Sequence, residues 1–292
     1  MGQRPLAATS ALLVLVLLPR VASSAPLDGD KQAHLIDPVT EMTFVSIAGG
    51  CFPMGNPDAL ALTPDNQLPK IGHSTPLFAD EAPVHQVCLE PFWIGQTEVT
   101  AKQWQRVMQQ QPPQGIDDQP ASGINWHQAQ RFIEALNQQA QGNAHYQLPS
   151  EAQWEYACRA GDTTSNPTNI AVQDDSTRPV QARHKLVHTA WYSVQGYRIA
   201  QPSPIAKLDS NGWGLHDMLG NVWEWTQDSY HSDSYLKHAY RNPLINDAAA
   251  ERVIRGGSHR SNFREIRCQN RSSYPPALSL PQIGLRLIRS QQ

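Results

Sequence analysis

The sequence has little charge of either sign. Charged residues make up 17% of its 292 positions, and 23 Lys and Arg are nearly balanced by 26 Asp and Glu. A nucleic-acid-binding protein needs a strong basic excess to neutralise phosphates, so we expect no nucleic-acid partner. Because 40% of the residues are hydrophobic, the chain can bury a sizeable core and is no disordered polyelectrolyte.

Several common catalytic and metal-binding motifs are missing. The sequence contains no phosphate-binding loop, no GxSxG nucleophile motif and no dinucleotide fingerprint. It has only four cysteines, and no two of them stand at the CxxC spacing of a zinc site. Nucleotide-dependent chemistry and a metal site built from cysteines are therefore disfavoured.

Long hydrophobic runs are also missing, with one exception. Leu6–Leu18 is an apolar run of about 13 residues, shorter than the roughly 20 that a membrane span needs. Arg4 precedes it, and small residues at 22–25 follow, which is typical of a Sec-type signal peptide. We expect residues 1–24 to be cleaved after Ser24, leaving a periplasmic or secreted protein with no membrane insertion.

Export bears on the cysteines Cys51, Cys88, Cys158 and Cys268. In an oxidising compartment an even number of cysteines favours disulfides over free thiols, and four cysteines allow three pairings. Spacing alone does not choose among these pairings.

Three helices are predicted from their first residues. Thr100, Asn125 and Ser150 can each cap a helix, and apolar residues follow at helical spacing. Ser150 and Gln153 form a capping box.

Strands and loops account for the rest of the chain. A polar lead-in at 25–41 precedes the expected domain at 42–292, and polar, Pro-rich or weakly patterned stretches predict loops. We predict one mixed α+β domain that is loop-rich and has little regular secondary structure. Its expected strands are 42–47, 84–94, 252–255 and 283–289, and its expected loops are 55–82 and 161–189.

Seven collinear motifs carry a resemblance to a known family. They are Gly49–Gly55 (GGCFPMG), Phe92–Thr100 (FWIGQTEVT), Ile124–Trp126 (INW), Leu148–Tyr156 (LPSEAQWEY), Gly214–Thr226 (GLHDMLGNVWEWT), Arg255–Ser258 (RGGS) and Gly284–Arg286 (GLR). In this order they resemble the formylglycine-generating-enzyme family, also called the sulfatase-modifying-factor domain. The resemblance covers about residues 42–289 and implies a fold related to C-type lectins.

The resemblance also implies how the cysteines pair. Family members often join the cysteine of the WEY-x-C helix to one near the C-terminus, which implies Cys158–Cys268 here and leaves Cys51 for Cys88. A further disulfide of formylglycine-generating enzymes would fall at Ile133 and Leu287. Both residues are aliphatic, so we expect a packing contact in its place.

The family's copper site is altered. Formylglycine-generating enzymes hold copper with two cysteines after the RGGS strand, and the matching positions are Ser261 and Phe263. Neither side chain suits Cu(I), which prefers thiolates, so we expect no copper. The candidate catalytic residues of this polar loop are Ser258, His259, Arg264 and Arg271, with His259 as the proton-transfer group and the arginines gripping anionic groups or pairing structurally.

A second inherited feature is a calcium loop. The matching ligand positions in this sequence are Asp217, Gly220, Val222 and Glu224. Side-chain and main-chain oxygens of this kind suit Ca²⁺, and the alternative is that the two acids only cap and pair locally.

Three classes of function fit these observations. The first is an exported oxidoreductase that tailors a peptide-like small molecule, because the family's branch without the copper cysteines includes a periplasmic protein of pyoverdine siderophore maturation. The second is a non-catalytic, lectin-like binding module. The third is a maturation factor that works with other exported enzymes. Fold analogy alone does not choose among them.

Overall fold

The structure is a computed structural model that describes residues 32–57, 59, 78–162, 188–193, 199–262 and 265–290. The predicted signal peptide, most of the predicted loops 55–82 and 161–189, and the pair Phe263 and Arg264 lie outside the described residues. The account that follows concerns the unit that begins at Gln32.

Among the described residues, no helix has the length and apolar character needed to cross a membrane.

In the described part of the chain, the strands form three sheets. Five antiparallel strands make the first, in the order β1 (His34–Ile36), β2 (Thr43–Ile47), β5 (Phe92–Gly95), β11 (Ile288–Ser290) and β6 (His145–Gln147). The second has the order β10 (Ile283–Leu285), β7 (Trp223–Ser229), β8 (Arg252–Arg255) and β9 (Arg271–Tyr274), with β10 parallel to β7. The third is the antiparallel pair β3 (Gly50–Met54) and β4 (His85–Leu89).

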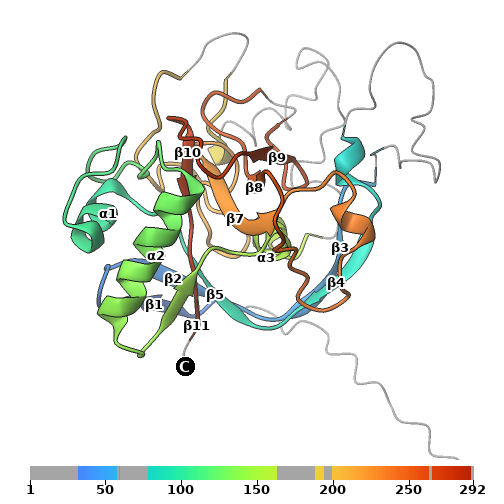
Figure 1. Cartoon of the computed structure of the whole chain (residues 1–292), viewed down its shortest axis with the longest axis horizontal. Coiled ribbons are helices and arrows are strands. Elements are labelled where there is room, and N and C mark those ends of the chain that lie inside the picture. Colours follow the sequence, from blue (N-terminus) through green and yellow to red (C-terminus); the bar gives the residue numbers. More distant parts are fainter. Residues whose placement is uncertain are drawn as a thin grey trace, which may run out of the picture. The chain divides into compact units, whose positions relative to one another are not determined.

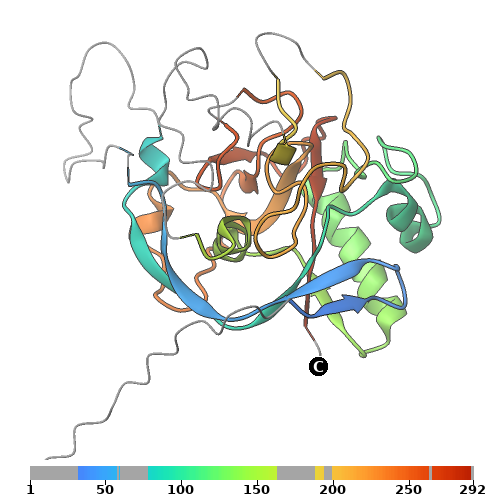
Figure 2. The same ribbon diagram turned by 180° about the vertical axis from the view of Figure 1, so that it is seen from behind.

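A long curved ribbon joins the first and third sheets. β2 leads into β3 and β4 leads into β5, and both views show the two pairs continuing into one another (Figures 1 and 2). The predicted strand 84–94 is therefore two strands, interrupted at Pro91, which has no N–H for the ladder. Gly49 lies against this break, where an added Cβ would stand 2.6 Å from the carbonyl oxygen of Leu89.

The three predicted helices are confirmed. They are α1 (Ala101–Met108), α2 (Trp126–Ala140) and α3 (Glu151–Arg159), and each begins with a capping box at its predicted cap. The cap side chain accepts from the N3 backbone N–H while the N3 glutamine accepts from the cap N–H. Local hydrogen bonding thus fixes where each helix begins.

Two hydrophobic clusters form the core. One contains Trp154 of α3 and much of the curved ribbon, and the other lies around α1, α2 and β7. In the second, Trp104 stacks on Phe132 with ring centroids 4.9 Å apart. Ile133 and Leu287 are both buried in this cluster, as expected where aliphatic residues replace a disulfide.

Two boundaries differ from the prediction. The stretch expected as a polar lead-in, 25–41, contains the strand β1, which pairs with β2. The predicted strand 283–289 is split between β10 and β11, which belong to different sheets. Both differences depend on which strands pair, and the local order of polar and apolar residues does not predict that pairing.

Candidate functional site

The loop after β8 begins at two glycines. Gly256 and Gly257 have φ of +96° and +80°, and a Cβ on Gly257 would lie 2.6 Å from Cδ1 of Ile266. Ser258 and Ser261 then close a tight turn: the Ser258 N–H donates to Ser261 Oγ at 3.1 Å, and the Ser261 N–H donates to the Ser258 carbonyl at 2.9 Å. Both serines are buried, so their hydroxyls contribute to the shape of this loop.

His259 is a buried titratable group of this loop. Its side chain is 1% exposed, and Nδ1 lies 2.7 Å from the carbonyl oxygen of Asn221, which can only accept. Nδ1 therefore carries the proton, and the lone pair is on Nε2, which is buried and has no hydrogen-bond partner. Burial lowers the pKa of His259, so the imidazole is a neutral base at pH 7.

No cysteine of this chain is available as a metal ligand. The four cysteines form Cys51–Cys88 and Cys158–Cys268, the pairing that the resemblance implies. Ser261, at the first copper position, has its hydroxyl in the turn with Ser258. The thiolate pair that would hold copper in this loop is therefore absent.

Arg264 lies outside the described residues, and Arg271 belongs to a different environment from His259. Arg271 makes a two-point ion pair with Glu151, at 2.6 Å and 2.9 Å, and donates to the carbonyl of Asp80 at 2.7 Å. Glu151 raises the pKa of Arg271, against the effect of burial. These contacts assign Arg271 to the support of α3 against β9.

Arg271 is one member of a buried ion-pair network around α3. Glu155 pairs with Arg159 at 2.7 Å and with Arg255 at 2.5 Å. These guanidinium groups hold the pKa of Glu155 below its usual range, although burial acts in the opposite direction. Removing one partner would leave an uncompensated charge in the core.

His85, the first residue of β4, forms a hydrogen-bonded pair with His238. His85 Nδ1 lies 3.0 Å from the carbonyl oxygen of Pro83, so its Nε2 accepts from His238 Nδ1 at 2.9 Å. Burial lowers the pKa of His238 to about 4, while Glu151 acts in the opposite direction.

The low pKa of His238 predicts a pH-dependent loss of stability. As pH falls from about 6.5 to 4, the unfolded chain takes up a proton that the native His238 does not, which lowers the unfolding free energy by up to about 3 kcal/mol. Urea denaturation of His238→Gln should therefore show less loss over this window than the wild type. Carboxyls with raised pKa, such as Asp228 at about 7, act with the opposite sign but cancel in the comparison. Identical pH profiles would contradict the prediction.

The predicted calcium residues meet a buried carboxylate cluster. Asp217 accepts from the Ala206 N–H at 2.7 Å through Oδ2, and its buried Oδ1 has no partner. Glu224 is engaged: Arg286 donates to both of its oxygens at 2.8–3.0 Å, and Trp154 Nε1 donates to Oε2 at 2.7 Å. Of these two acidic side chains, Asp217 has an oxygen available to a cation, whereas both oxygens of Glu224 are already hydrogen-bonded.

Glu98 is a member of this cluster that the sequence did not assign. It is fully buried, and neither carboxylate oxygen has a hydrogen-bond partner. Burial, together with the charges of Asp217 and Glu224, raises the pKa of Glu98 well above its usual value. The one acid of the FWIGQTEVT motif was the signal that could have identified it.

The charges of the cluster do not balance. Glu98, Asp217 and Glu224 face one guanidinium, that of Arg286, so full ionisation would leave two negative charges buried. Protons or a cation must compensate them. The described residues contain no set of three His, Cys, Asp or Glu side chains already arranged around a metal ion.

The protein is a loop-rich α+β domain. It has an RGGS turn after β8, two disulfides and buried Arg–Glu ion pairs around α3. Residues 32–291 match the sulfatase-modifying factor enzyme 1-like domain, and the chain belongs to that family. The fold class expected from the motifs is thereby confirmed.

Three relatives show how far the similarity extends. The chain is 27% identical over 218 residues to the formylglycine-generating enzyme of Mus musculus, covering 70% of this chain and 52% of that enzyme. It is 25% identical over 256 residues to the chaperone protein LppX of Paenibacillus barcinonensis, covering 70% of this chain and 82% of LppX. The structure of PvdO from Pseudomonas aeruginosa superposes with a TM-score of 0.71 at 22% identity, over 90% of this chain and 99% of PvdO. The chain thus spans about half the length of the mouse enzyme.

Proposed function

We propose that this chain is an exported oxidoreductase that tailors a peptide-like small molecule, such as a siderophore chromophore, without copper. The observation that carries the proposal is the loop after β8, where the thiolates are absent and His259 presents a buried, unpartnered Nε2 lone pair. The motif pattern, the signal-peptide-like segment 1–24 and the fold shared with PvdO support it.

The proposed reaction is a two-electron oxidation of a dihydro chromophore. His259 Nε2 accepts one proton from the substrate, while dioxygen takes the two electrons and a second proton equivalent. The proton on His259 then completes hydrogen peroxide, so the chromophore gains one double bond and one O₂ becomes H₂O₂. Because Nε2 is covered by protein, neighbouring side chains must move to admit the substrate. Arg264 remains the proposed partner for an anionic group of that substrate.

A precursor assay tests this function. A strain that lacks the protein should accumulate the unoxidised precursor, and the purified protein should convert it with formation of peroxide. The control is a sulfatase-type cysteine peptide with added copper, which should not be converted. If the wild-type protein converts no accumulated precursor, the proposal is wrong.

A maturation factor is the second candidate. The similarity to the chaperone protein LppX favours it, since that name describes assistance to another protein. In this case the deletion strain would lose the activity of another exported enzyme, and the purified chain would restore it without consuming oxygen. A non-catalytic, lectin-like module would bind the precursor and leave it unchanged.

We also propose a structural calcium ion at the carboxylate cluster. The unpartnered oxygens of Glu98 and Asp217 are hard donors of the kind Ca²⁺ prefers, and a divalent cation would balance two negative charges. Main-chain oxygens of Gly220 and Val222 would complete the set, whereas Glu224 would act mainly through Arg286.

The calcium proposal predicts sensitivity to chelation. A cation that binds only the folded state stabilises it by mass action, by about 2.7 kcal/mol at 100 times Kd. EDTA should therefore lower the melting temperature, and Asp217→Ala should remove most of this effect. The exposed Asp209→Ala is the matched control and should leave it intact. Binding should strengthen as pH rises, because Ca²⁺ must displace protons from carboxyls with raised pKa. Melting that is indifferent to EDTA would contradict the proposal.

A further inference from the structure

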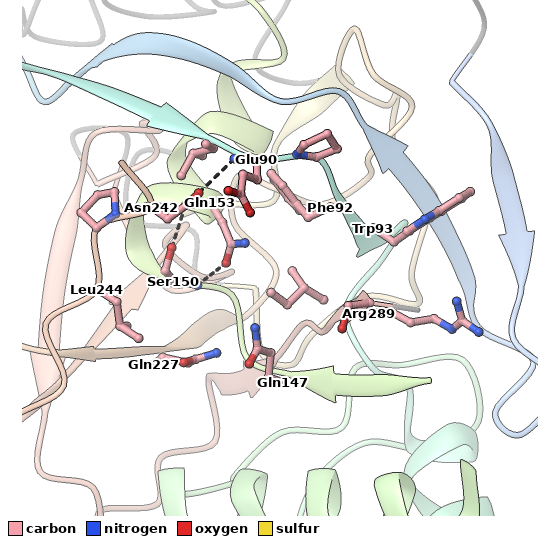
Figure 3. Close-up of a pocket in the computed structure, with 15 residues that line it drawn as sticks. Glu90, Phe92, Trp93, Gln147, Ser150, Gln153, Gln227, Asn242, Leu244 and Arg289 are labelled. Carbon is pink, nitrogen blue, oxygen red and sulfur yellow. Dashed lines mark hydrogen bonds between the residues drawn. The ribbon is translucent and has the colours of Figure 1, made fainter. Parts of the chain in front are cut away.

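We infer that a cavity away from the His259 loop binds a short peptide segment that carries no acidic group. The cavity encloses about 460 Å³ and is lined by the β4–β5 turn, β6, the start of α3, β7, the 242–244 loop and β11 (Figure 3). Its lining includes neither the His259 loop nor the carboxylate cluster around Glu98. The inference therefore goes beyond the proposed oxidation and does not depend on it.

The walls of this cavity are joined by hydrogen bonds. The Asn242 N–H donates to the carbonyl of Cys88 at 2.9 Å, and the Glu90 N–H donates to Asn242 Oδ1 at 2.9 Å. On the other side, the Gln227 N–H donates to the carbonyl of Pro149 at 3.0 Å. These bonds are present without a ligand, so the site is largely preorganised.

Four carboxamide side chains belong to the polar part of the lining, and in two of them one atom of the amide group is already hydrogen-bonded to the protein. Gln227 Nε2 donates to the carbonyl of Leu148 at 2.6 Å, which leaves Oε1 as an acceptor. Gln153 Oε1 accepts from the Ser150 N–H at 2.9 Å, which leaves Nε2 as a donor. Each side chain is therefore oriented before a ligand arrives.

Two further carboxamides add to this set. Asn242 Oδ1 is occupied by Glu90, so Nδ2 is left as a donor. The Gln147 side chain has no hydrogen bond to another described residue, and it converges with Gln153 and Gln227 on one hollow (Figure 3). Donors and acceptors of this kind complement the alternating C=O and N–H groups of a peptide backbone.

The positions of the charged and aromatic residues of the lining disfavour an anionic ligand and a sugar. Arg289 belongs to the lining, but its guanidinium turns away from the carboxamides and lies 3.6 Å from Asp37 (Figure 3). Glu90 also lines the hollow, and its carboxylate disfavours an anionic ligand. Trp93 points away as well, and Phe92 is 8% exposed, which leaves no open aromatic face on which a sugar could stack. Leu244, 45% exposed at the rim, can instead contact an apolar side chain of the peptide.

Nuclear magnetic resonance of the mature ¹⁵N-labelled protein tests the inference. The probes are three capped tripeptides, acetyl-Gly-X-Gly-amide with Leu, Phe or Val as X. At least one should shift the side-chain NH₂ signals of Gln147, Gln153, Gln227 and Asn242. Because one hydrogen bond contributes about 1 kcal/mol, Gln147→Met should raise Kd about 3–10-fold without changing the melting temperature. Gln86→Met, at an exposed glutamine of β4 outside the cavity, is the matched control and should leave Kd unchanged.

Three outcomes would overturn it. The first is that no peptide shifts these signals at saturating concentration. The second is that the shifts lie outside the cavity. The third is that a neutral disaccharide such as maltose produces equal shifts at lower concentration. The last result would assign the cavity to carbohydrate.

Discussion

Replacing His259 with alanine is expected to lower precursor turnover by roughly 10²–10⁴-fold, the usual contribution of a general base. The wild-type imidazole is held in one tautomer by the Asn221 carbonyl, so its Nε2 is a base without any proton rearrangement. Burial lowers the pKa of His259 below its usual value, which favours the neutral base. The rate should therefore fall only when pH approaches that lowered pKa, which a pH profile of kcat/KM would show.

A second substitution separates catalysis from structure. In His259→Asn the amide N–H can still donate to Asn221, but the base is gone. If His259 is catalytic, His259→Asn should regain the melting temperature of the wild type and remain as slow as His259→Ala. If His259→Asn recovers turnover, His259 is not the general base and only stabilises the loop.

Removing the Cys158–Cys268 disulfide is expected to cause the largest loss of stability. This bond closes a loop of 110 residues, and the Cys51–Cys88 bond closes one of 37. In the chain-entropy model these loops correspond to about 5 and about 4 kcal/mol. Both cysteines of the longer loop are also buried, 2% and 0% exposed, so their replacement disturbs packing as well. Against a total stability of about 5–15 kcal/mol, the first loss is severe.

Urea denaturation of the two double alanine variants measures these losses. Cys51→Ala with Cys88→Ala is the matched control, because it removes a bond between directly opposed residues of β3 and β4 whose ladder remains. The control should lose less free energy of unfolding than Cys158→Ala with Cys268→Ala. An equal or larger loss in the control would contradict the prediction, and peptide mapping of the unreduced protein would verify the pairing.

The three helices and the cysteine pairing could be predicted for different reasons. Thr100, Asn125 and Ser150 accept from N–H groups three residues away, so each helix start depends on local sequence alone. The disulfide pairing came from the resemblance, since the cysteines themselves allowed three arrangements. The candidate loop was also located by its RGGS motif. However, the tautomer of His259 depends on Asn221, 38 positions away in the sequence.

Strands and charges show the limits of local patterns. β7 reads WEWTQDS and is buried on both faces, so it shows no alternation between polar and apolar residues. β10 and β11 are separated by only two residues yet pair in different sheets. Of the two alternatives left open for Arg271, a grip on substrate or a structural pair, the structure shows the pair, with Glu151 across 120 positions.

By itself the sequence determined the family, the caps of the helices, the absence of a copper thiolate pair and the positions of the candidate residues. The tertiary structure decided which of these residues have partners. Burial and long-range pairing gave Arg271 and Glu224 full sets of hydrogen bonds, and left Glu98, Asp217 and His259 with buried polar atoms that have none. The physical reason is that desolvation and pairing depend on neighbours brought together only by folding, whereas capping and composition are properties of the chain itself.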